Sequence, residues 1–456
     1  MEIKGKRFLV IGAARSGQAV AKFLLKYGAH VFLNDLKKRE DLGVGELEDL
    51  EKRGVQLILG QHPVLNEIGP DFLIVSPGVP FSIPPLLEAQ KSGIPVWSEI
   101  ELAARFAKAP LVAVTGTNGK TTTTTLIGKI FSDSGRKAFV RGNIGEPLIS
   151  KVEEISYEDI IVLEVSSFQL ETTETFRPKV ALILNLTPDH IDRHDNFAGY
   201  CRAKKKIFLN QQENDWLILN VDDLETKKLA AQTKGKVLFF SRQHILEEGF
   251  CVLDGWLVVK HKGQITRLLP TEDLQIKGSH NLENALAAAA AGWVMGVEVE
   301  SLAYSLRTFL GVEHRLEPVL TYQGVTYIND SKGTNPDASI KALEAYDQPI
   351  VLIAGGKSKG SDFLPFAIKI KEKVKELVLV GQAAPEIAEA VRKVGYTKIH
   401  HVSSFAEAVK EASRLAKEGE IVLLSPACAS FDLFANFEQR GDVFKELVHR
   451  LTEEKS

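Results

Sequence analysis

Apolar residues gather in short runs along this chain, and most runs end in a glycine-bearing or polar turn that leads into a helical pattern. Residues 7–11 form one such run, residues 12–17 the turn after it, residues 18–27 a helical stretch, and residues 30–34 the next run. Short apolar runs that alternate with helical patterns predict the buried strands of a parallel sheet. The fold class expected from this pattern is α/β.

The same pattern continues to the C-terminal end. Further strands are predicted at residues 72–75, 95–97, 112–115, 159–164, 180–185, 216–223, 237–240, 325–329, 349–354, 376–380 and 420–424. The alternating region 250–268 predicts β-hairpins, and residues 285–296 predict an alanine-rich helix. A chain of 456 residues is too long to fold around a single hydrophobic core and suggests about three domains.

We therefore predict three domains. Residues 1–98 are expected to form a Rossmann-like domain, and residues 99–311 a central P-loop ATPase-like domain with a mostly parallel sheet. Residues 312–456 are expected to form a second, doubly wound Rossmann-like domain.

Charge and cysteine content narrow the function classes. The net charge of −3 gives no global field that would recruit nucleic acid or an anionic membrane. Three widely spaced cysteines form no disulfide framework, which fits a reducing cytoplasm. No apolar run approaches the length of a membrane span, and the first residues lead into a strand rather than a signal peptide. We expect a cytoplasmic monomer without membrane insertion.

The stretch Val112-Ala-Val-Thr-Gly-Thr-Asn-Gly-Lys-Thr-Thr122 carries the strongest chemical signal. It predicts a buried strand, a tight turn through Gly116 and Gly119, and a helix whose N-terminal N–H groups suit an anion. Lys120 adds a positive charge, and the hydroxyl of Thr121 can ligate Mg²⁺. Its glycine spacing is shorter than that of the standard P-loop, so a plain strand-to-helix turn is the alternative.

The first domain has its own glycine turn, residues 12–17, between two predicted strands. Ala14 replaces the middle glycine of the dinucleotide fingerprint, which favours another nucleotide-diphosphate ligand over a dinucleotide. Asp35 and the turn Ser76-Pro-Gly78 follow two strands of this domain, at the edge where ligands of open sheets bind. For Ser76–Gly78 alone, a plain turn is the simpler interpretation.

Polar residues at other strand ends are candidate metal and ligand contacts. Glu164 ends an apolar strand, which suits Mg²⁺, although a solvated acid is the alternative. His190 lies in a loop at the same edge, where it is a metal or phosphate contact or merely surface. Lys204 belongs to a basic run that is ordinarily a solvated face, and carbamylation would make it an anionic ligand.

Three further features remain open on the residues alone. Asn281 and Asn284 precede the alanine-rich helix and either cap it or face a ligand. The lysine-bearing loop 355–360 suits a carboxylate-bearing ligand better than a second phosphate loop. Cys428 has no nearby histidine and is interpreted as a small buried residue.

Six dispersed motifs together resemble the Mur ligases of peptidoglycan synthesis. They are Thr115-Gly-Thr-Asn-Gly-Lys-Thr121, Glu164-Val-Ser-Ser-Phe-Gln169, Asn185-Leu-Thr-Pro-Asp-His190, His280-Asn281 with Asn284, His314-Arg315 and Asn329-Asp-Ser-Lys332. The match runs through all three predicted domains in order. The segment Ser425-Pro-Ala-Cys-Ala-Ser-Phe-Asp432, followed by Asn436-Phe-Glu-Gln-Arg-Gly441, resembles the branch of the family that adds D-glutamate.

The resemblance implies a reaction and its cofactors. ATP would phosphorylate the carboxylate of UDP-N-acetylmuramoyl-L-alanine, and the amine of D-glutamate would attack the acyl phosphate. Two Mg²⁺ ions are implied, with Thr121, Glu164, His190 and a carbamylated Lys204 as ligands. Lys120, Glu164, His190 and Lys204 are implied as catalytic. The product would serve cell-wall biogenesis, and with it cell shape and division.

The resemblance also assigns binding residues. ATP is assigned to Gly116, Thr117, Asn118, Gly119, Lys120, Thr121, Thr122, Asn281, Asn284, Arg315, Asp330 and Lys332. The UDP-linked substrate is assigned to Arg15, Ser16, Asp35, Ser76, Pro77, Gly78, Asn143, Ser166, Gln169 and His190. D-glutamate is assigned to Lys359, Ser430 and Phe437.

Three alternatives stay open. One is a sister ligase that adds another amino acid, and another is a folate polyglutamate ligase, which the Rossmann-like first domain disfavours. The third is a nucleotide-driven switch or assembly protein, which would need the phosphate loop but not the lysine-bearing loops of the third domain.

Overall fold

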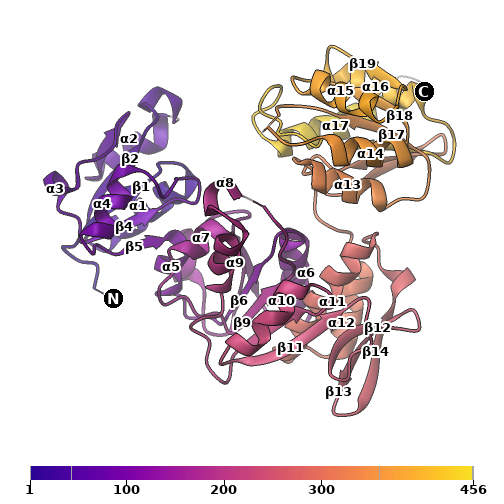
Figure 1. Ribbon diagram of the computed structural model, residues 1–456. Coiled ribbons are helices and arrows are strands. Elements are labelled where there is room, and N and C mark those ends of the chain that lie inside the picture. Colours follow the sequence, from indigo (N-terminus) through magenta and orange to yellow (C-terminus); the bar gives the residue numbers. More distant parts are fainter. Residues whose placement is uncertain (1, 43, 190, 359, 454–456) are drawn as a thin grey trace. The chain divides into compact units, whose positions relative to one another are not determined.

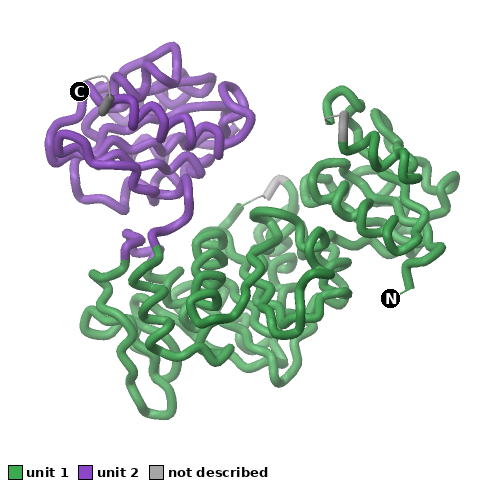
Figure 2. Tube along the Cα trace, turned by 180° about the vertical axis from the view of Figure 1, so that it is seen from behind, with its two compact units in different colours: residues 1–274, 282–309 green, residues 275–281, 310–456 purple. Residues whose placement is uncertain are grey.

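The computed structural model describes residues 2–42, 44–189, 191–358 and 360–453, and its strands form three sheets (Figure 1). Residues 1–274 and 282–309 make one compact unit, called unit 1 here, and residues 275–281 and 310–456 make unit 2 (Figure 2). Unit 1 holds the first two sheets and unit 2 holds the third. The predicted α/β architecture with three sheets is confirmed.

The first sheet is a small parallel sheet. Its strands are β1 (Arg7–Ile11), β2 (His30–Asp35), β3 (Gln56–Leu59), β4 (Phe72–Val75) and β5 (Val96–Ser98), in the order β3-β2-β1-β4-β5. The helices around it are α1 (Arg15–Lys26), α2 (Val44–Lys52), α3 (Leu65–Ile68) and α4 (Pro84–Lys91). Phe8 and Val10 pack into one apolar cluster and Leu9 and Ile11 into another, so both faces of β1 are covered.

The strand order of this sheet reverses direction at β1. The chain runs from β1 outward to β3 on one side and from β4 to β5 on the other. A crevice for ligands opens at such a switch point, beyond the carboxyl ends of the central strands. The loops that leave β1 and β4 at this edge are residues 12–14 and the turn beginning at Ser76.

The central sheet combines a parallel body with an antiparallel extension. Its strands are β6 (Leu111–Thr115), β7 (Ala138–Gly142), β8 (Ile160–Glu164), β9 (Val180–Ile183), β10 (Trp216–Asn220), β11 (Lys236–Ser241), β12 (Gly249–Leu253), β13 (Trp256–His261) and β14 (Gln264–Pro270). Their order is β14-β13-β12-β11-β10-β9-β6-β8-β7, and the ladders β12–β13 and β13–β14 are antiparallel. The predicted hairpins at residues 250–268 are confirmed.

Eight helices accompany the central sheet among the described residues. They are α5 (Glu99–Ala104), α6 (Lys120–Asp133), α7 (Ser167–Glu171), α8 (Ile191–His194), α9 (Phe197–Lys205), α10 (Leu224–Lys227), α11 (Ser279–Val294) and α12 (Val299–Thr308). The prediction that the alanine-rich helix begins at residue 285 is wrong, because α11 begins at Ser279. Asn281 and Asn284 are therefore helical residues rather than residues that precede the helix.

Helix α5 connects the first sheet to the central one. It follows β5 directly and buries two carboxylates. Glu101 accepts hydrogen bonds from the backbone N–H groups of Glu174, Thr175 and Phe176. Glu99 accepts one from the N–H of Ile149 at 2.7 Å. Since a buried carboxylate is stable only when it is well hydrogen-bonded, these contacts fix α5 against two loops of the central sheet.

The third sheet is doubly wound. Its strands are β15 (Glu317–Tyr322), β16 (Val325–Asn329), β17 (Ile350–Ala354), β18 (Val374–Leu379), β19 (Ile399–His401) and β20 (Ile421–Leu424), in the order β15-β16-β20-β17-β18-β19. The helices are α13 (Pro336–Glu344), α14 (Leu364–Lys373), α15 (Ala384–Lys393), α16 (Phe405–Leu415) and α17 (Phe437–Glu453). Leu352 and Ile353 pack into separate apolar clusters on opposite faces, as a sheet covered on both sides requires.

Two simpler predictions can also be compared with the structure. Cys201, Cys251 and Cys428 form no disulfide with one another, and Cys428 is buried in an apolar cluster, as expected. In the part of the chain that the structure describes, no helix combines the length and apolar character needed to cross a bilayer.

Candidate active site

The phosphate loop joins β6 to α6 at the carboxyl edge of the central sheet. Gly119 has a φ of +85°, and a Cβ atom built on it would lie 2.2 Å from the Asn284 Oδ1 atom. Only glycine fits this position, because a side chain would be both strained and in collision. Helix α6 begins at the next residue, Lys120, so the N–H groups at its N-terminus lie at the loop.

Lys120 lies over its own loop. Its Nζ atom donates to the carbonyl oxygens of Gly116 and Thr117, both at 2.9 Å. These contacts hold a positive charge beside the N-terminus of α6, and both features attract phosphate oxygens.

Glu164 ends β8, which pairs with β6 in parallel, so Glu164 lies opposite Val114 near the phosphate loop. Its side chain is 3% exposed, and its Oε1 atom accepts from the Asn143 side-chain amide at 3.0 Å. Within the described ranges, its Oε2 atom is buried with no hydrogen-bond partner. A buried carboxylate oxygen of this kind suits a bound cation.

Lys204 comes from α9 and is 1% exposed. Its Nζ atom donates to the carbonyl oxygen of Gly116 at 2.8 Å and to the hydroxyl of Thr115 at 3.2 Å. Burial, and after it the charge of Lys120, lower the pKa of Lys204 well below that of an ordinary lysine. The buried amine is thereby biased toward its neutral, nucleophilic form.

Thr117 is tied to two elements that lie far apart in the sequence. Its Oγ1 atom bonds the Tyr200 hydroxyl at 3.0 Å and accepts from the backbone N–H of Thr187, also at 3.0 Å. The Tyr200 ring centroid lies 4.8 Å from the Nζ atom of Lys204. Tyr200 therefore contacts both the phosphate loop and the buried lysine.

The two asparagines of α11 have local partners. The Asn284 Oδ1 atom accepts from the Thr123 hydroxyl of α6 at 3.2 Å. The Asn281 side-chain amide donates to the carbonyl oxygen of Lys277 at 2.7 Å, which holds the first turn of α11. Ser166 and Gln169 likewise bond one another, and their reciprocal contacts form a capping box at the start of α7.

Hydrogen bonds join the strand-end loops of the first sheet. The carboxylate of Asp35 accepts from the N–H of Ala13 at 2.8 Å and from the N–H of Lys37 at 2.9 Å. The Ser76 hydroxyl donates to the carbonyl oxygen of Gly12 at 3.2 Å. The structure thus brings the glycine turn, Asp35 and the turn Ser76-Pro-Gly78 together at the switch point.

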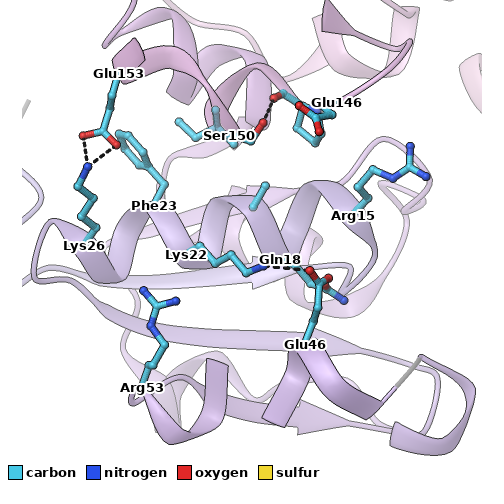
Figure 3. A pocket seen from close by; sticks show the side chains of 13 residues that line it. Arg15, Gln18, Lys22, Phe23, Lys26, Glu46, Arg53, Glu146, Ser150 and Glu153 are labelled. Atoms are coloured by element: carbon cyan, nitrogen blue, oxygen red, sulfur yellow. Dashed lines mark hydrogen bonds and ion pairs between the residues drawn. The ribbon is translucent and has the colours of Figure 1, made fainter. Parts of the chain in front are cut away.

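Arg15 and Ser16 begin helix α1 at the same edge. Arg15 also lines a cavity of about 710 Å³ that extends along α1 toward the loop 146–153 of the central region (Figure 3). The ion pairs of Lys22 with Glu46 and of Lys26 with Glu153 border this cavity, with Nζ to oxygen distances of 3.1 and 2.7 Å.

Unit 2 has a second cluster at the carboxyl edge of the third sheet. Asp330 follows β16 and accepts from the Ser425 hydroxyl at 2.6 Å, and burial raises the pKa of its carboxyl group to about 7. The Nζ atom of Lys332 lies 5.4 Å from the ring centroid of Phe437, the first residue of α17. Ser430 is buried in the loop that follows β20, the neighbour of β16. Arg315 lies in the loop before β15.

Comparison with known proteins places all three sheets in one family. Residues 6–98 match the Mur ligase MurD-like N-terminal domain, residues 114–292 the Mur ligase middle domain, and residues 314–428 the Mur ligase glutamate ligase domain. The UDP-N-acetylmuramoylalanine–D-glutamate ligase of Pelotomaculum thermopropionicum is 55% identical over 97% of each chain. The chain belongs to the Mur ligase family. The enzyme of the same name from Desulfitobacterium hafniense strain DCB-2 is 48% identical over 99% of each chain.

Solved structures agree with this Mur ligase in fold. The MurF ligase of Thermotoga maritima in complex with ADP has a TM-score of 0.63 at 17% identity and covers the whole of both chains. The UDP-N-acetylmuramate-alanine ligase MurC of the same organism has a TM-score of 0.61 at 20% identity, over 98% of this chain and 99% of its own. At these identities the likeness concerns the fold alone.

Sequence reasoning gave no role to some residues that the geometry makes prominent. The side chain of Asn185 brackets Asn118 of the phosphate loop, accepting from its N–H at 2.8 Å and donating to its carbonyl at 3.1 Å. The position of Asn185 at the end of a predicted strand was a usable signal. Tyr200 gave no such signal, because an aromatic residue in a helix is most often part of the core. His190 and Lys359 lie outside the described residues.

Proposed function

We propose that this Mur ligase uses ATP to join D-glutamate to UDP-N-acetylmuramoyl-L-alanine in peptidoglycan precursor synthesis. The observation that carries the proposal is the 55% identity, over 97% of both chains, with a relative named for that reaction. The convergence of Lys120, Glu164 and Lys204 at the phosphate loop supports it, because phosphoryl transfer depends on positioning and on neutralising charge.

In the first step, an oxygen of the L-alanine carboxylate attacks the γ-phosphorus of ATP, and the bond to the β-phosphate oxygen breaks to release ADP. Lys120 and the N-terminal N–H groups of α6 hold the phosphates and offset the negative charge. In the second step, the D-glutamate amine attacks the carbonyl carbon of the acyl phosphate. The tetrahedral intermediate expels phosphate, and the nitrogen loses its extra proton to give the amide.

The residues at the phosphate loop fit Mg²⁺. The buried Oε2 atom of Glu164 is a ready ligand, and we assign the Thr121 hydroxyl, His190 and a modified Lys204 to the same task for two ions. Bound Mg²⁺ would neutralise phosphate charge and orient the transferring group.

We propose that Lys204 carries a carbamate. A neutral amine adds to CO₂ with loss of one proton, and the product is an anion that can ligate a cation. The low pKa of Lys204, caused first by its burial, favours the neutral amine. As an uncharged or anionic group, Lys204 is also compatible with cations nearby, which an ammonium would repel.

The remaining assignments distribute three substrates over the fold. Besides the phosphate loop, ATP is assigned to Asn281, Asn284, Arg315, Asp330 and Lys332. The UDP-linked substrate is assigned to the switch point of the first sheet, with Arg15, Ser16 and the turn Ser76-Pro-Gly78 at the diphosphate and Asp35 near the uracil. Asn143, Ser166, Gln169 and His190 are assigned to its muramoyl-alanine part. Lys359, Ser430 and Phe437 are assigned to D-glutamate.

We propose that domains 1–98, 99–311 and 312–456 chiefly bind the UDP-linked acid, ATP and the amino acid, respectively. Some assigned residues lie in another domain: Arg315, Asp330 and Lys332 of the third domain are assigned to ATP, and Asn143, Ser166, Gln169 and His190 of the central domain to the muramoyl-alanine part. We further propose that the enzyme acts in the cytoplasm as a monomer.

The decisive experiment measures phosphate release with ATP, Mg²⁺ and UDP-N-acetylmuramoyl-L-alanine while the amino acid is varied. D-glutamate is expected to stimulate release strongly, and L-glutamate serves as the matched control. Lack of stimulation by D-glutamate would refute the proposal. Faster turnover with L-lysine or a diamino acid would identify a sister ligase instead, and ATP hydrolysis that no amino acid affects would point to a nucleotide-driven switch.

A further inference from the structure

A buried arginine joins three segments of unit 2. Arg440, on α17, is 3% exposed. Its Nε atom donates to the Ser331 hydroxyl at 3.0 Å, and its Nη2 atom donates to the Ser331 carbonyl oxygen at 2.8 Å. The Nη1 and Nη2 atoms both donate to the carbonyl oxygen of Cys428 at 3.2 Å. The guanidinium fork therefore bonds a loop on each side of it.

Ser331 is the second residue of this set of contacts, and we call the contacts Ser331–Arg440–Cys428 the junction. Its hydroxyl accepts from Arg440 and donates to the carbonyl oxygen of Phe437 at 2.8 Å, which ties it to the start of α17. Its N–H donates to the Asn329 side-chain oxygen at 3.1 Å. The Ser331 hydroxyl is fully buried and thus has both its donor and its acceptor capacity engaged.

The three joined segments carry the residues assigned to two substrates. Ser331 lies between Asp330 and Lys332, which are assigned to ATP. Cys428 lies two residues before Ser430, and Phe437 begins α17, and these two residues are assigned to D-glutamate. Close packing leaves the junction little freedom, since a Cβ atom on Gly356 would lie 3.2 Å from the Arg440 Nη1 atom and 2.3 Å from the Ala429 carbonyl oxygen.

A second hydrogen bond, between Ser425 and Asp330, connects the same two loops. The Ser425 hydroxyl donates to Asp330 at 2.6 Å, and its oxygen lies 2.8 Å from the Ser339 hydroxyl, within hydrogen-bonding distance. The loop after β16 and the loop after β20 are therefore connected at two separate points, Asp330–Ser425 and Ser331–Arg440–Cys428. A loop edge held this way moves as one body rather than as two independent loops.

We propose that Ser331 and Arg440 are positioning residues that hold the ATP-contacting loop and the D-glutamate-contacting loop of unit 2 in one fixed register. The inference rests on the proposed function, since it uses the substrates assigned there. Neither residue contacts substrate in this scheme. Each acts through the backbone that it bonds, so that loss of the junction lets Ser430 and Phe437 drift from Asp330 and Lys332.

The test compares Ser331→Ala and Arg440→Lys with Ser413→Ala. Ser413 lies on α16 of the same unit, and its hydroxyl bonds the buried Tyr327 hydroxyl at 2.8 Å. Ser413→Ala therefore removes a similar hydroxyl contact away from the junction. The melting temperature and the KM values for ATP, D-glutamate and UDP-N-acetylmuramoyl-L-alanine are measured for each variant and for the unsubstituted enzyme.

We expect Ser331→Ala and Arg440→Lys to raise the KM for D-glutamate on the order of tenfold and that for ATP severalfold, because buried groups lose their partners and the loops shift. The KM for the UDP-linked substrate should stay within about twofold, since its assigned contacts lie in unit 1. Ser413→Ala should lower the melting temperature comparably and leave all three KM values unchanged.

The results distinguish a positioning role of the junction from a purely structural one, and both from a failure of the proposed function. If the two junction variants lower the melting temperature but keep the D-glutamate KM of Ser413→Ala, the junction is structural only and the inference fails. If Ser331→Ala does not fold, Arg440→Lys decides the question by the same criterion. If the unsubstituted enzyme does not use D-glutamate, the proposed function fails instead, and that result is read from the wild-type assay alone.

Discussion

Lys204 in unit 1 and Arg440 in unit 2 are both buried basic side chains that donate to carbonyl and hydroxyl oxygens of neighbouring loops. Burial lowers the pKa of Arg440 only to about 10, so its guanidinium stays charged at neutral pH. Burial and the charge of Lys120 lower the pKa of Lys204 well below its ordinary value. Burial therefore leaves the guanidinium charged in unit 2, whereas in unit 1 it lowers the pKa of the amine.

Replacing the buried lysine should give the largest effect. Lys204→Met keeps the volume and the apolar stem but removes the amine, so turnover should fall on the order of 10³-fold or more. The free energy of unfolding should change by less than about 1 kcal/mol or rise, because burying a polar or charged group costs free energy that the methionine side chain does not. Phosphate release and urea unfolding measure the two quantities.

Lys205→Met is the matched control, because Lys205 is the next residue of α9 and is only half-buried. It should keep near-normal turnover. Lys204→Ala should regain part of its activity with a small added carboxylate that takes the place of the proposed carbamate. Unaltered turnover of Lys204→Met would contradict the chemical role of the buried amine.

Replacing the buried arginine should act on stability first. Arg440→Met leaves the carbonyl oxygens of Ser331 and Cys428 without their donor in a buried site. The free energy of unfolding should fall by about 3 kcal/mol. Urea unfolding of Arg440→Met and Lys204→Met side by side tests the contrast. Equal losses of stability in the two variants would show that the two cations play the same structural part.

The two units can also be compared through their buried acids. Burial raises the pKa of Glu99 in unit 1 and of Asp330 in unit 2, each to about 7. Unfolded carboxyl groups titrate near pH ~4. Between these values the folded protein keeps protons that the unfolded chain has released, so the free energy of unfolding falls as pH rises, by at most about 1.4 kcal/mol per pH unit for each group. Above about pH 7 this slope disappears.

Glu99→Gln and Asp330→Asn should each flatten part of that slope when unfolding is followed from pH 5 to pH 8. Glu99→Gln should leave turnover unchanged because Glu99 bonds the N–H of Ile149 and is assigned to no substrate. Asp330→Asn should also raise the KM for ATP, to which Asp330 is assigned. If the free energy of unfolding fell more steeply with pH in either variant, the pKa of the replaced group would not be raised in the folded protein, and the prediction would be wrong.

The smallest expected effect concerns Tyr200. Tyr200→Phe removes the hydroxyl that bonds Thr117 but keeps the ring beside Lys204. Loss of one such hydrogen bond costs about 1 kcal/mol, so the KM for ATP should rise about fivefold. Tyr327→Phe, which removes the bond to Ser413 in unit 2, should leave this KM unchanged. An equal change of the KM for ATP in both variants would show that Tyr200 has no specific role in holding the phosphate loop.

The interior strands were predictable and several edge strands were not. Strands such as β6 and β17 are buried along their whole length, and buried parallel strands are unbroken apolar runs in the sequence. The four strands that were not predicted are β3, β7, β15 and β19, and each lies at an edge of its sheet. Edge strands are half exposed, and their mixed composition, as in the Glu-Pro start of β15, hides the strand signal.

The site was predictable where a residue's place in a strand–turn–helix pattern suffices. Gly119 and Lys120 are examples: the turn requires a glycine at position 119, and Lys120 lies at the N-terminus of the helix that follows. Contacts between distant segments were not predictable. Arg440 and Ser331 are separated by more than a hundred residues, and nothing local marks them as partners. The orphaned oxygen of Glu164 is likewise a product of packing and has no trace in the sequence.

Helix α11 is shared between the two units: residues 279–281 belong to unit 2 and the rest to unit 1. Unit 2 is therefore discontinuous along the chain, since residues 275–281 precede its main segment by nearly thirty residues. A fragment that begins at residue 310 would lose residues 275–281, including Gly278, where a built Cβ atom would lie 3.5 Å from the Ala345 Cβ atom. A cut before residue 275 would keep this segment with unit 2, but it would also remove residues 282–309, which include most of α11 and all of α12, from unit 1. A boundary at either residue 275 or residue 310 therefore takes residues away from one of the two units, which matters for anyone dividing the protein into separately expressed parts.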